Sequence, residues 1–200
     1  MIKAVIFNYG GVIIKMVPAF KYANFLSRLY NLPKRIIKRK VSPFFILLQK
    51  GIISETEFYR RLSLALGKPI PKNAKGAWRR CVKDNFHLYP GIIRLVKKIK
   101  AKGIKTAILS NTIKSHIGVI KKPFIYKNFD VLIFSCRVGA KKPELKIYKI
   151  LLQKLKVKPK ECLFIDDTKE NLKPARKLGM KVVLAKNPKQ VIGDVQKILD

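Results

Sequence analysis

Five short runs of apolar residues recur along this 200-residue chain, and they constrain its fold more than any other feature. The runs are rich in Val, Ile, Leu and Phe and lie at 4–7, 106–109, 131–134, 162–165 and 181–184. Strands of a parallel sheet are covered on both faces, so they are apolar throughout rather than alternating with polar residues. The five runs therefore predict a buried parallel sheet.

Helical patterns separate these runs. The clearest lie at 92–101, 147–155 and 172–178, and Pro90 and Gly103 flank the first of them while Gly179 ends the last. Proline is favoured where a helix begins and glycine just beyond its end. Strands that alternate with helices in this way predict a doubly wound α/β domain.

One long segment breaks the alternation and reads as helices throughout. These predicted helices lie at 19–30, 33–40, 43–49, 55–66 and 74–85. A helical domain inserted into the α/β domain accounts for them. We therefore predict an α/β core formed by 1–16 and 88–200, with a helical cap formed by 17–87.

The charge is very unequal, with 45 Lys and Arg against 11 Asp and Glu and a formal net charge of +34. An anionic partner is compatible with this balance, and nonspecific binding to polyanions would follow from charge alone. However, the lysines are spread over almost every predicted helix and do not form one stripe with aromatic residues between them. We interpret them as a solvated basic surface rather than a dedicated nucleic-acid site.

The sequence contains no apolar run near the roughly 20 residues that a membrane-spanning helix needs. Its three cysteines, Cys81, Cys136 and Cys162, are widely spaced and have no paired metal-ligand spacing. Buried thiols in a reducing compartment explain them best, and we expect a cytoplasmic location.

Polar residues gather where the predicted strands end. Asn8 follows the first strand, Ser110-Asn111-Thr112 ends the second, and Asp166-Asp167 ends the fourth. Ligands of open parallel sheets bind at the carboxyl ends of the strands. Taken singly, the polar residues of 110–112 could be a helix cap, and the two aspartates could be an N-cap and a solvated carboxylate. Adjacent carboxylates repel each other unless a cation lies between them, which favours a metal.

At these positions the chain resembles the haloacid dehalogenase (HAD) superfamily of hydrolases. The matching segments are AVIFNYGGVI (4–13), AILSNT (107–112), GAKKPELKIY (139–148) and LFIDDTKENLKPARKLGM (163–180). Their order, together with the inserted cap, carries the resemblance, and the Gly-Gly turn is most similar to that of the small-cap, phosphatase-like branch. This resemblance implies hydrolysis of small phosphomonoesters through a covalent aspartyl intermediate.

The resemblance also implies roles for single residues. The nucleophilic carboxylate falls at Asn8, and the acid that protonates the leaving group falls at Gly10. Ser110 and Asn111 would hold the phosphoryl oxygens, and Lys142 would neutralise charge beside the nucleophile.

The implied cofactor is Mg²⁺. Its ligands would be Asp167, supported by Asp166, together with the side chain at Asn8 and the backbone carbonyl of Gly10. Asn171 matches a polar position of the fourth segment, where it would support the aspartate loop.

Asn8 is the decisive departure from the family pattern. A carboxamide is neutral and cannot form an acyl phosphate, so we predict that activity is absent or severely reduced. Losing one negative charge should leave phosphate binding intact or improve it. Two other origins of Asn8 stay open: neutral drift at a site that is no longer used, and deliberate introduction of the amide to trap a substrate. The alternative function is therefore that of a pseudoenzyme, a noncatalytic protein that binds a phosphorylated ligand or a polyanion. Dehalogenation ranks third, because it needs the same missing carboxylate.

The cap offers weaker candidates. Arg79, Arg80 and Lys83 lie near Trp78 and could meet an anionic group, but packing of the tryptophan within the cap and solvated arginines explain them more simply. Tyr22, Phe25 and Tyr30 have helical spacing and are expected to be core residues.

Overall fold

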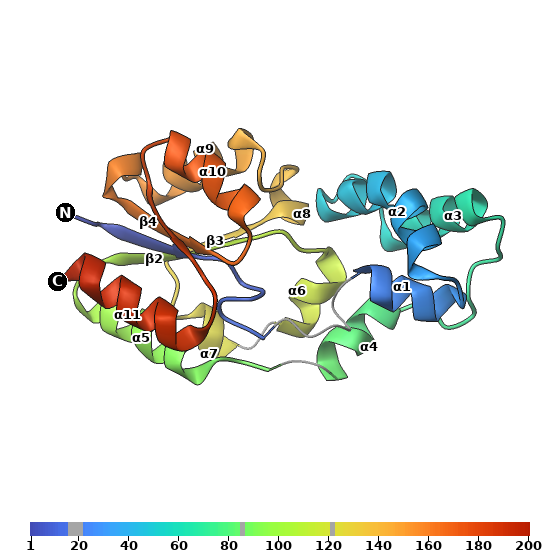
Figure 1. The fold of residues 1–200 in the computed structure, drawn as a ribbon, viewed down its shortest axis with the longest axis horizontal. Coiled ribbons are helices and arrows are strands. Elements are labelled where there is room, and N and C mark those ends of the chain that lie inside the picture. The colour runs from blue at the N-terminus through green and yellow to red at the C-terminus, as the bar shows by residue number, and fades with distance from the viewer. Residues whose placement is uncertain (16–21, 85–86, 121–122) are drawn as a thin grey trace.

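The computed structural model describes residues 1–15, 22–84, 87–120 and 123–200. Its centre is a parallel sheet of five strands in the order β3-β2-β1-β4-β5 (Figure 1). The strands are β1 (Ala4–Phe7), β2 (Lys105–Ser110), β3 (Val131–Phe134), β4 (Cys162–Asp166) and β5 (Lys181–Leu184). All five predicted strands, and the doubly wound α/β class, are confirmed.

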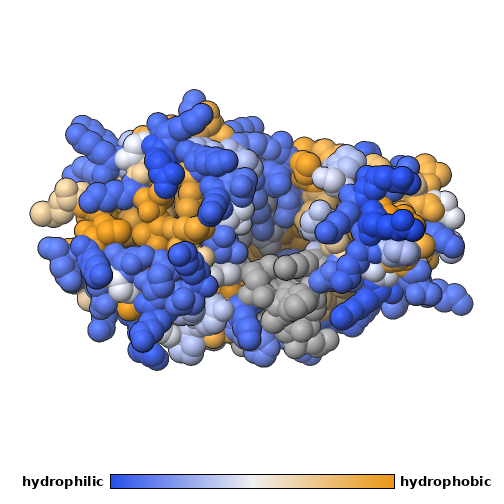
Figure 2. Space-filling model, in the orientation of Figure 1, coloured by the Kyte–Doolittle hydropathy of each residue, from blue (hydrophilic) through white to orange (hydrophobic). Residues whose placement is uncertain are grey.

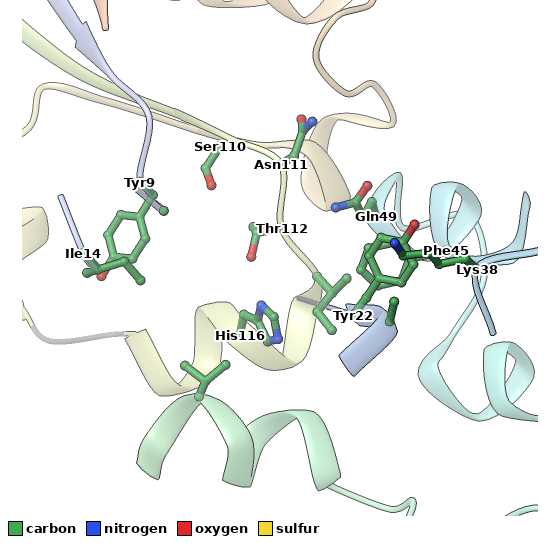
Figure 3. Close-up of a pocket in the computed structure, with 14 residues that line it drawn as sticks. Tyr9, Ile14, Tyr22, Lys38, Phe45, Gln49, Ser110, Asn111, Thr112 and His116 are labelled. Carbon is green, nitrogen blue, oxygen red and sulfur yellow. The ribbon is translucent and has the colours of Figure 1, made fainter. Parts of the chain in front are cut away.

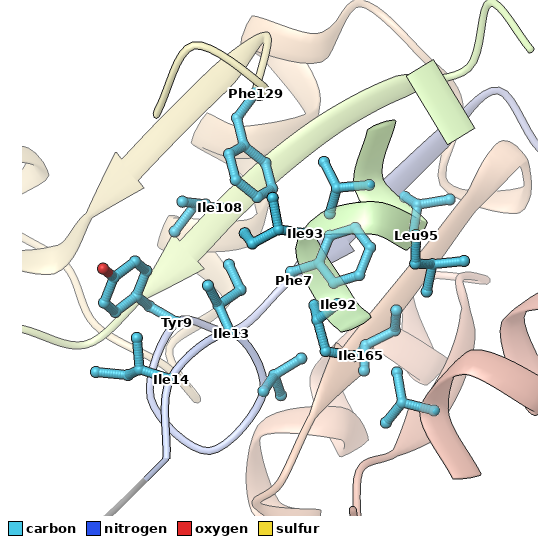
Figure 4. Packing of buried hydrophobic residues seen from close by; sticks show 14 of the residues in the cluster. Phe7, Tyr9, Ile13, Ile14, Ile92, Ile93, Leu95, Ile108, Phe129 and Ile165 are labelled. Carbon is cyan, nitrogen blue, oxygen red and sulfur yellow. The ribbon is translucent and has the colours of Figure 1, made fainter. Parts of the chain in front are cut away.

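Helices cover both faces of the sheet. One face carries α5 (Pro90–Ala101) and α11 (Pro188–Leu199), and the other carries α9 (Leu145–Leu155) and α10 (Lys169–Lys177) (Figure 1). Successive side chains of a strand point to opposite faces. In β1, Val5 and Phe7 accordingly pack towards α5 and α11, while Ala4 and Ile6 pack towards α9. Figure 4 shows the first of these layers around Phe7.

Several short helices had no counterpart in the sequence prediction. They are α6 (Lys114–Ile120), α7 (Pro123–Tyr126), α8 (Ser135–Val138) and the 3₁₀ turn at Pro159–Glu161, and α11 was missed as well. The elements of three to seven residues carry too few turns to show a helical period. In α11, the start is marked by Asn187, whose side chain accepts a hydrogen bond from the Gln190 N–H at 2.9 Å.

The inserted helices form a separate lobe beside the carboxyl ends of the strands (Figure 1). They are α1 (Tyr22–Tyr30), α2 (Lys34–Gln49), α3 (Glu55–Leu66) and α4 (Ala77–Asp84). The predicted break between 33–40 and 43–49 was wrong, because α2 runs through Pro43. Proline removes one helix hydrogen bond, but Ile37, Val41 and Leu48 are buried along one continuous face and hold the helix together. The predicted helix ends at 19–21 and at 85 lie outside the described residues.

Two strand-like segments join the cap to the core. The Lys15 N–H donates to the His87 carbonyl at 2.8 Å, and the Tyr89 N–H donates to the Ile13 carbonyl at 2.9 Å. The chain therefore leaves and re-enters the core at one place. The predicted boundary between 16 and 17 lies outside the described residues, and the division into domains remains a prediction.

The surface shown in Figure 2 carries hydrophilic residues over both the core and the cap, without one dominant stripe. Cys136 and Cys162 are buried thiols. None of the helices in the described ranges is long and apolar enough to cross a membrane.

Candidate active site

The sheet order brings the predicted polar residues to one edge. β1 lies between β2 and β4, and all three are parallel. Asn8 directly follows β1, Ser110 ends β2 and Asp166 ends β4, so their side chains meet at the carboxyl ends of the central strands. All three residues are buried. The structure thus assembles in one place residues that are far apart in the sequence.

Lys142 lies at the centre of this group, only 1% exposed. Its Nζ donates to the Asn8 Oδ1 at 2.9 Å, to the Leu109 carbonyl at 2.8 Å and to the Asp166 Oδ2 at 2.5 Å. An ammonium group has three hydrogens, so every donor is engaged. Burial lowers the pKa of Lys142, and the charge of Asp166 opposes this effect.

Asp166 anchors the other side of this ion pair and is fully buried. It also accepts hydrogen bonds from the Thr168 N–H at 2.9 Å and from the Asn171 Nδ2 at 3.0 and 3.2 Å. Tyr148 in turn donates its hydroxyl to the Asn171 carbonyl at 2.6 Å. Asn171 therefore lies where the resemblance implies, against the aspartate loop. With both oxygens of Asp166 engaged, its carboxylate holds Lys142 rather than facing the cavity.

Asn8 makes four hydrogen bonds through its side-chain amide. Its Nδ2 donates to the Gly10 carbonyl at 2.6 Å and to the Asp167 Oδ1 at 2.9 Å. Its Oδ1 accepts from the Tyr9 N–H and from the Lys142 Nζ, both at 2.9 Å. The amide thus contacts both charged members of the site without carrying a charge.

Asp167 is held more loosely than Asp166: the residue as a whole is exposed, although its carboxylate contacts Asn8 and Gly11. Desolvation raises its pKa, the negative charge of Asp166 adds to this rise, and the Asn8 hydrogen bond opposes it. Gly11 packs against this carboxylate at φ +82°, and a Cβ there would come within 2.3 Å of the Asp167 Oδ2. Only glycine fits this turn.

The arrangement does not fit Mg²⁺ as it lies. Two of the implied ligands, the Gly10 carbonyl and the Asp167 Oδ1, are oxygens of the kind that Mg²⁺ prefers. Between them, however, lies the Asn8 Nδ2, a donor that cannot bind a cation. In the described part of the chain, no group of three or more His, Cys, Asp or Glu residues could hold a metal ion.

A cavity of about 400 Å³ opens between these strand ends and the cap (Figure 3). Ser110, Asn111 and Thr112 form its core wall, and Tyr22, Phe45 and Gln49 face them from the cap. Further lining residues are Tyr9, Gly10, Ile14, Ala23, Lys38, Val82, Ile113 and His116. Sequence reasoning missed most of these residues, because no local spacing shows which side chains of a separate lobe will face the core.

The predicted cap candidates lie elsewhere. Trp78 is buried, and its ring centroid lies 4.0 Å from that of Phe25 in the cap and 5.8 Å from that of His116 in α6. Arg80 donates to the Asn73 and Lys75 carbonyls, and Arg79 and Lys83 are exposed. None of these cations lines the cavity described above. Phe25 and Tyr30 pack in the cap core as expected, whereas Tyr22 also lines the cavity.

The fold and this site together define a capped, doubly wound α/β protein with a buried lysine and paired aspartates at the strand ends. A family model described as haloacid dehalogenase-like hydrolase matches residues 2–179. The chain belongs to this family, and the resemblance seen in the sequence is confirmed at that level.

Among curated relatives, the mouse protein named acyl-CoA dehydrogenase family member 10 is 28% identical to this chain. The match includes 98% of this chain and 19% of the mouse protein. The chain spans between 19 and 27% of the length of this protein and of bifunctional epoxide hydrolase 2 from Rattus norvegicus, Mus musculus and Sus scrofa. A phosphorylated carbohydrates phosphatase from Thermotoga maritima is 24% identical over 89% of this chain and 82% of its own length.

A solved structure of a HAD family enzyme from Bacteroides thetaiotaomicron, in complex with magnesium and inorganic phosphate, superposes with a TM-score of 0.74. It is 24% identical and covers 94% of this chain and 96% of its own. At this identity the likeness establishes the fold alone. Magnesium is therefore a ligand of that enzyme, which shares the fold of this chain.

Proposed function

We propose that this chain is a phosphatase-type HAD protein that binds small phosphomonoesters and whose hydrolytic activity is absent or severely reduced. The observation that carries the proposal is the position of the Asn8 amide. It lies at the end of the central strand, in contact with Lys142 and Asp167, where the family resemblance requires a nucleophilic carboxylate. Gly10, in addition, stands where the resemblance requires the acid that protonates the leaving group.

The cavity supports a small organic phosphate as the ligand. Ser110 and Asn111 line its core wall, which is where the resemblance implies the phosphoryl oxygens. The opposite wall contains the rings of Tyr22 and Phe45, whose centroids are 4.6 Å apart. The volume of about 400 Å³ lies within the range of small-molecule sites. The phosphoryl group would bind at the core, and the organic part would pack against the cap.

Hydrolysis in the family pattern needs a carboxylate oxygen that attacks phosphorus. As the new bond forms, the bond from phosphorus to the ester oxygen breaks and the leaving oxygen takes a proton, which water would have to supply here because Gly10 replaces the family's acid. Water later hydrolyses the acyl phosphate. The Asn8 amide lacks the charge for the first step and cannot be released as a carboxylate after the last. An Asn8→Asp variant restores the attacking group, and with it the negative charge that magnesium would neutralise.

The test is a phosphatase assay on a panel of phosphomonoesters with Mg²⁺, comparing the native chain with its Asn8→Asp variant. We expect turnover from the variant at least about a hundredfold above the native chain. An Asn8→Ala variant controls for contaminating phosphatase and should be as inactive as the native chain. Equal turnover by the native chain and the Asn8→Asp variant would refute the role assigned to Asn8.

If neither chain turns over any ester, binding decides the outcome. Saturable binding of one phosphomonoester would support the noncatalytic alternative. Weak binding to any polyanion, falling steeply with salt, would instead mean that the net charge of +34 is responsible and that the cavity is not a phosphate site.

A further inference from the structure

The Asn8 amide has only one orientation that its neighbours accept. Two donors, the Tyr9 N–H and the Lys142 Nζ, point at its Oδ1, and two acceptors, the Gly10 carbonyl and the Asp167 Oδ1, face its Nδ2. A carboxamide offers two hydrogens and two lone pairs, so all four are satisfied. Turning the amide over would place its hydrogens against an ammonium group and its oxygen against a carboxylate. Both contacts would be repulsive, so the network fixes the orientation.

The amide hydrogens meet the same oxygens that would bind a cation. In the family pattern, the Gly10 carbonyl and Asp167 would face the metal, and here the Nδ2 of Asn8 lies 2.6 and 2.9 Å from them. A positively polarised N–H group near a carboxylate replaces part of the stabilisation that a cation would give. For the side chain of Asn8 to become a ligand through its oxygen, the four hydrogen bonds would have to be broken first.

The net charge of the site also favours an amide over a metal ion. With aspartate at position 8, three carboxylates would surround the single charge of Lys142, leaving an excess of two negative charges. With Asn8, Lys142 neutralises Asp166 at 2.5 Å, and Asp167 alone is left over. Its carboxylate is the one that the amide contacts. The electrostatic need for a divalent cation is therefore much smaller in this chain.

We propose that the side-chain amide of Asn8 takes the place of the metal ion, so that the phosphate site of this chain works without Mg²⁺. The ligand class is an oxyanion, inorganic phosphate or a phosphomonoester, and in this respect the inference rests on the function proposed above. The response of the chain to Mg²⁺ does not depend on that function and can be measured without any phosphate.

The first experiment titrates Mg²⁺ alone into the metal-free full chain, by calorimetry and by thermal unfolding. We expect the native chain to show little heat and no rise in Tm, and the Asn8→Asp variant to bind Mg²⁺ at least about tenfold more tightly. Equal affinity in the two chains would overturn the proposal.

Asn8→Ala distinguishes a blocking amide from a ligating one. If the amide takes the cation's place, its removal uncovers the Gly10 carbonyl and Asp167, and Mg²⁺ affinity should rise above that of the native chain. If Asn8 were a ligand through its oxygen, the same change would lower the affinity, and the proposal would fail. If Asn8→Asp is unstable, the comparison of the native chain with Asn8→Ala still decides between these two outcomes.

The second experiment measures binding of inorganic phosphate with EDTA and with Mg²⁺. The native chain should bind phosphate with the same affinity in both, within about a factor of two, whereas Asn8→Asp should need the metal. Native binding that appears only with Mg²⁺ would overturn the proposal. Absence of phosphate binding in every condition would count against the proposed function, while the titration with Mg²⁺ alone would still decide the role of the amide.

Discussion

The side chain of Asn111 exchanges two hydrogen bonds with the backbone of Lys142. Its Nδ2 donates to the Lys142 carbonyl at 2.9 Å, and its Oδ1 accepts from the Lys142 N–H at 2.8 Å. The resemblance assigned Asn111 to the phosphoryl oxygens; here one hydrogen and one lone pair of its amide fix the loop that carries the buried lysine. Ser110 and Thr112, the other two residues of this wall, also line the cavity.

Replacing Asn111 should therefore act through Lys142. Asn111→Ala leaves a backbone N–H and a carbonyl of Lys142 without their partners, and we expect a loss of about 1–3 kcal/mol in the free energy of unfolding. Phosphate affinity should fall together with stability. Chemical denaturation measures the free energy of unfolding, and calorimetry measures the phosphate affinity. Asn73→Ala, at an exposed cap position, should change stability by less than about 0.5 kcal/mol. An Asn111→Ala chain with native stability would contradict the positioning role.

Removing one partner of the buried ion pair should lower the free energy of unfolding more than replacing both partners together. Asp166→Asn leaves Lys142, which is 1% exposed, without its counter-charge, and the expected loss is about 3–5 kcal/mol. The double variant Asp166→Asn, Lys142→Met carries no buried charge and should be more stable than the single Asp166→Asn variant. Urea denaturation of Asp166→Asn, of Lys142→Met and of the double variant gives the coupling energy. Additive effects would mean that the two charges do not depend on each other.

The position of the cap relative to the core should depend on Gly51. A Cβ at this position would come within 2.2 Å of the Cys136 carbonyl oxygen, which belongs to the core helix α8. Gly51→Ala should therefore push the cap away from the core and weaken phosphate binding severalfold.

Gly67 provides the matched control for Gly51. Both glycines have positive φ, +69° and +62°, but a Cβ at Gly67 meets nothing within 4 Å among the described residues. Gly67→Ala should show only the cost of the left-handed backbone, about 1 kcal/mol, with native phosphate affinity. Small-angle scattering and proteolysis would report an opened cap in the Gly51→Ala variant. If both variants behave alike, the contact with Cys136 does not position the cap.

Stability should fall in mild acid because of His116. Burial lowers the pKa of this imidazole from 6.5 to about 4, and its Nε2 has no hydrogen-bond partner within the described part of the chain. Between these values the unfolded chain binds a proton that the folded chain does not, so stability rises with pH in this window and is lost as pH falls through it. The loss attributable to His116 should approach about 3 kcal/mol at pH 4.

Comparison with His116→Gln isolates this contribution from that of the carboxylates. The variant keeps a polar side chain but has no imidazole at this position to titrate between pH 4 and 6.5, so its stability should decline less over this range. Thermal unfolding from about pH 4 to 8 measures both chains. Parallel curves for the native chain and the His116→Gln variant would show that the imidazole is not the group responsible.

The sequence by itself determined the scaffold of this protein. Residues of β1 such as Val5 and Ile6 are apolar on both faces, and only a strand covered on both sides buries them all, so the parallel sheet follows from local composition. The polar residues Asn8, Ser110 and Asp166 lie at the ends of strands. Because parallel strands end at one edge, their meeting was also predictable.

Only the tertiary structure decided how these residues use their hydrogen bonds. The amide of Asn8 turns its nitrogen towards Asp167 because Lys142, 134 positions away, approaches from the other side. The faces of α2 that line the cavity, including Phe45, depend on how the cap docks on the core, and Pro43 stays within that helix because its buried face outweighs one lost hydrogen bond. Local patterns specify elements, whereas the orientation of an amide or the wall of a cavity depends on contacts between distant residues.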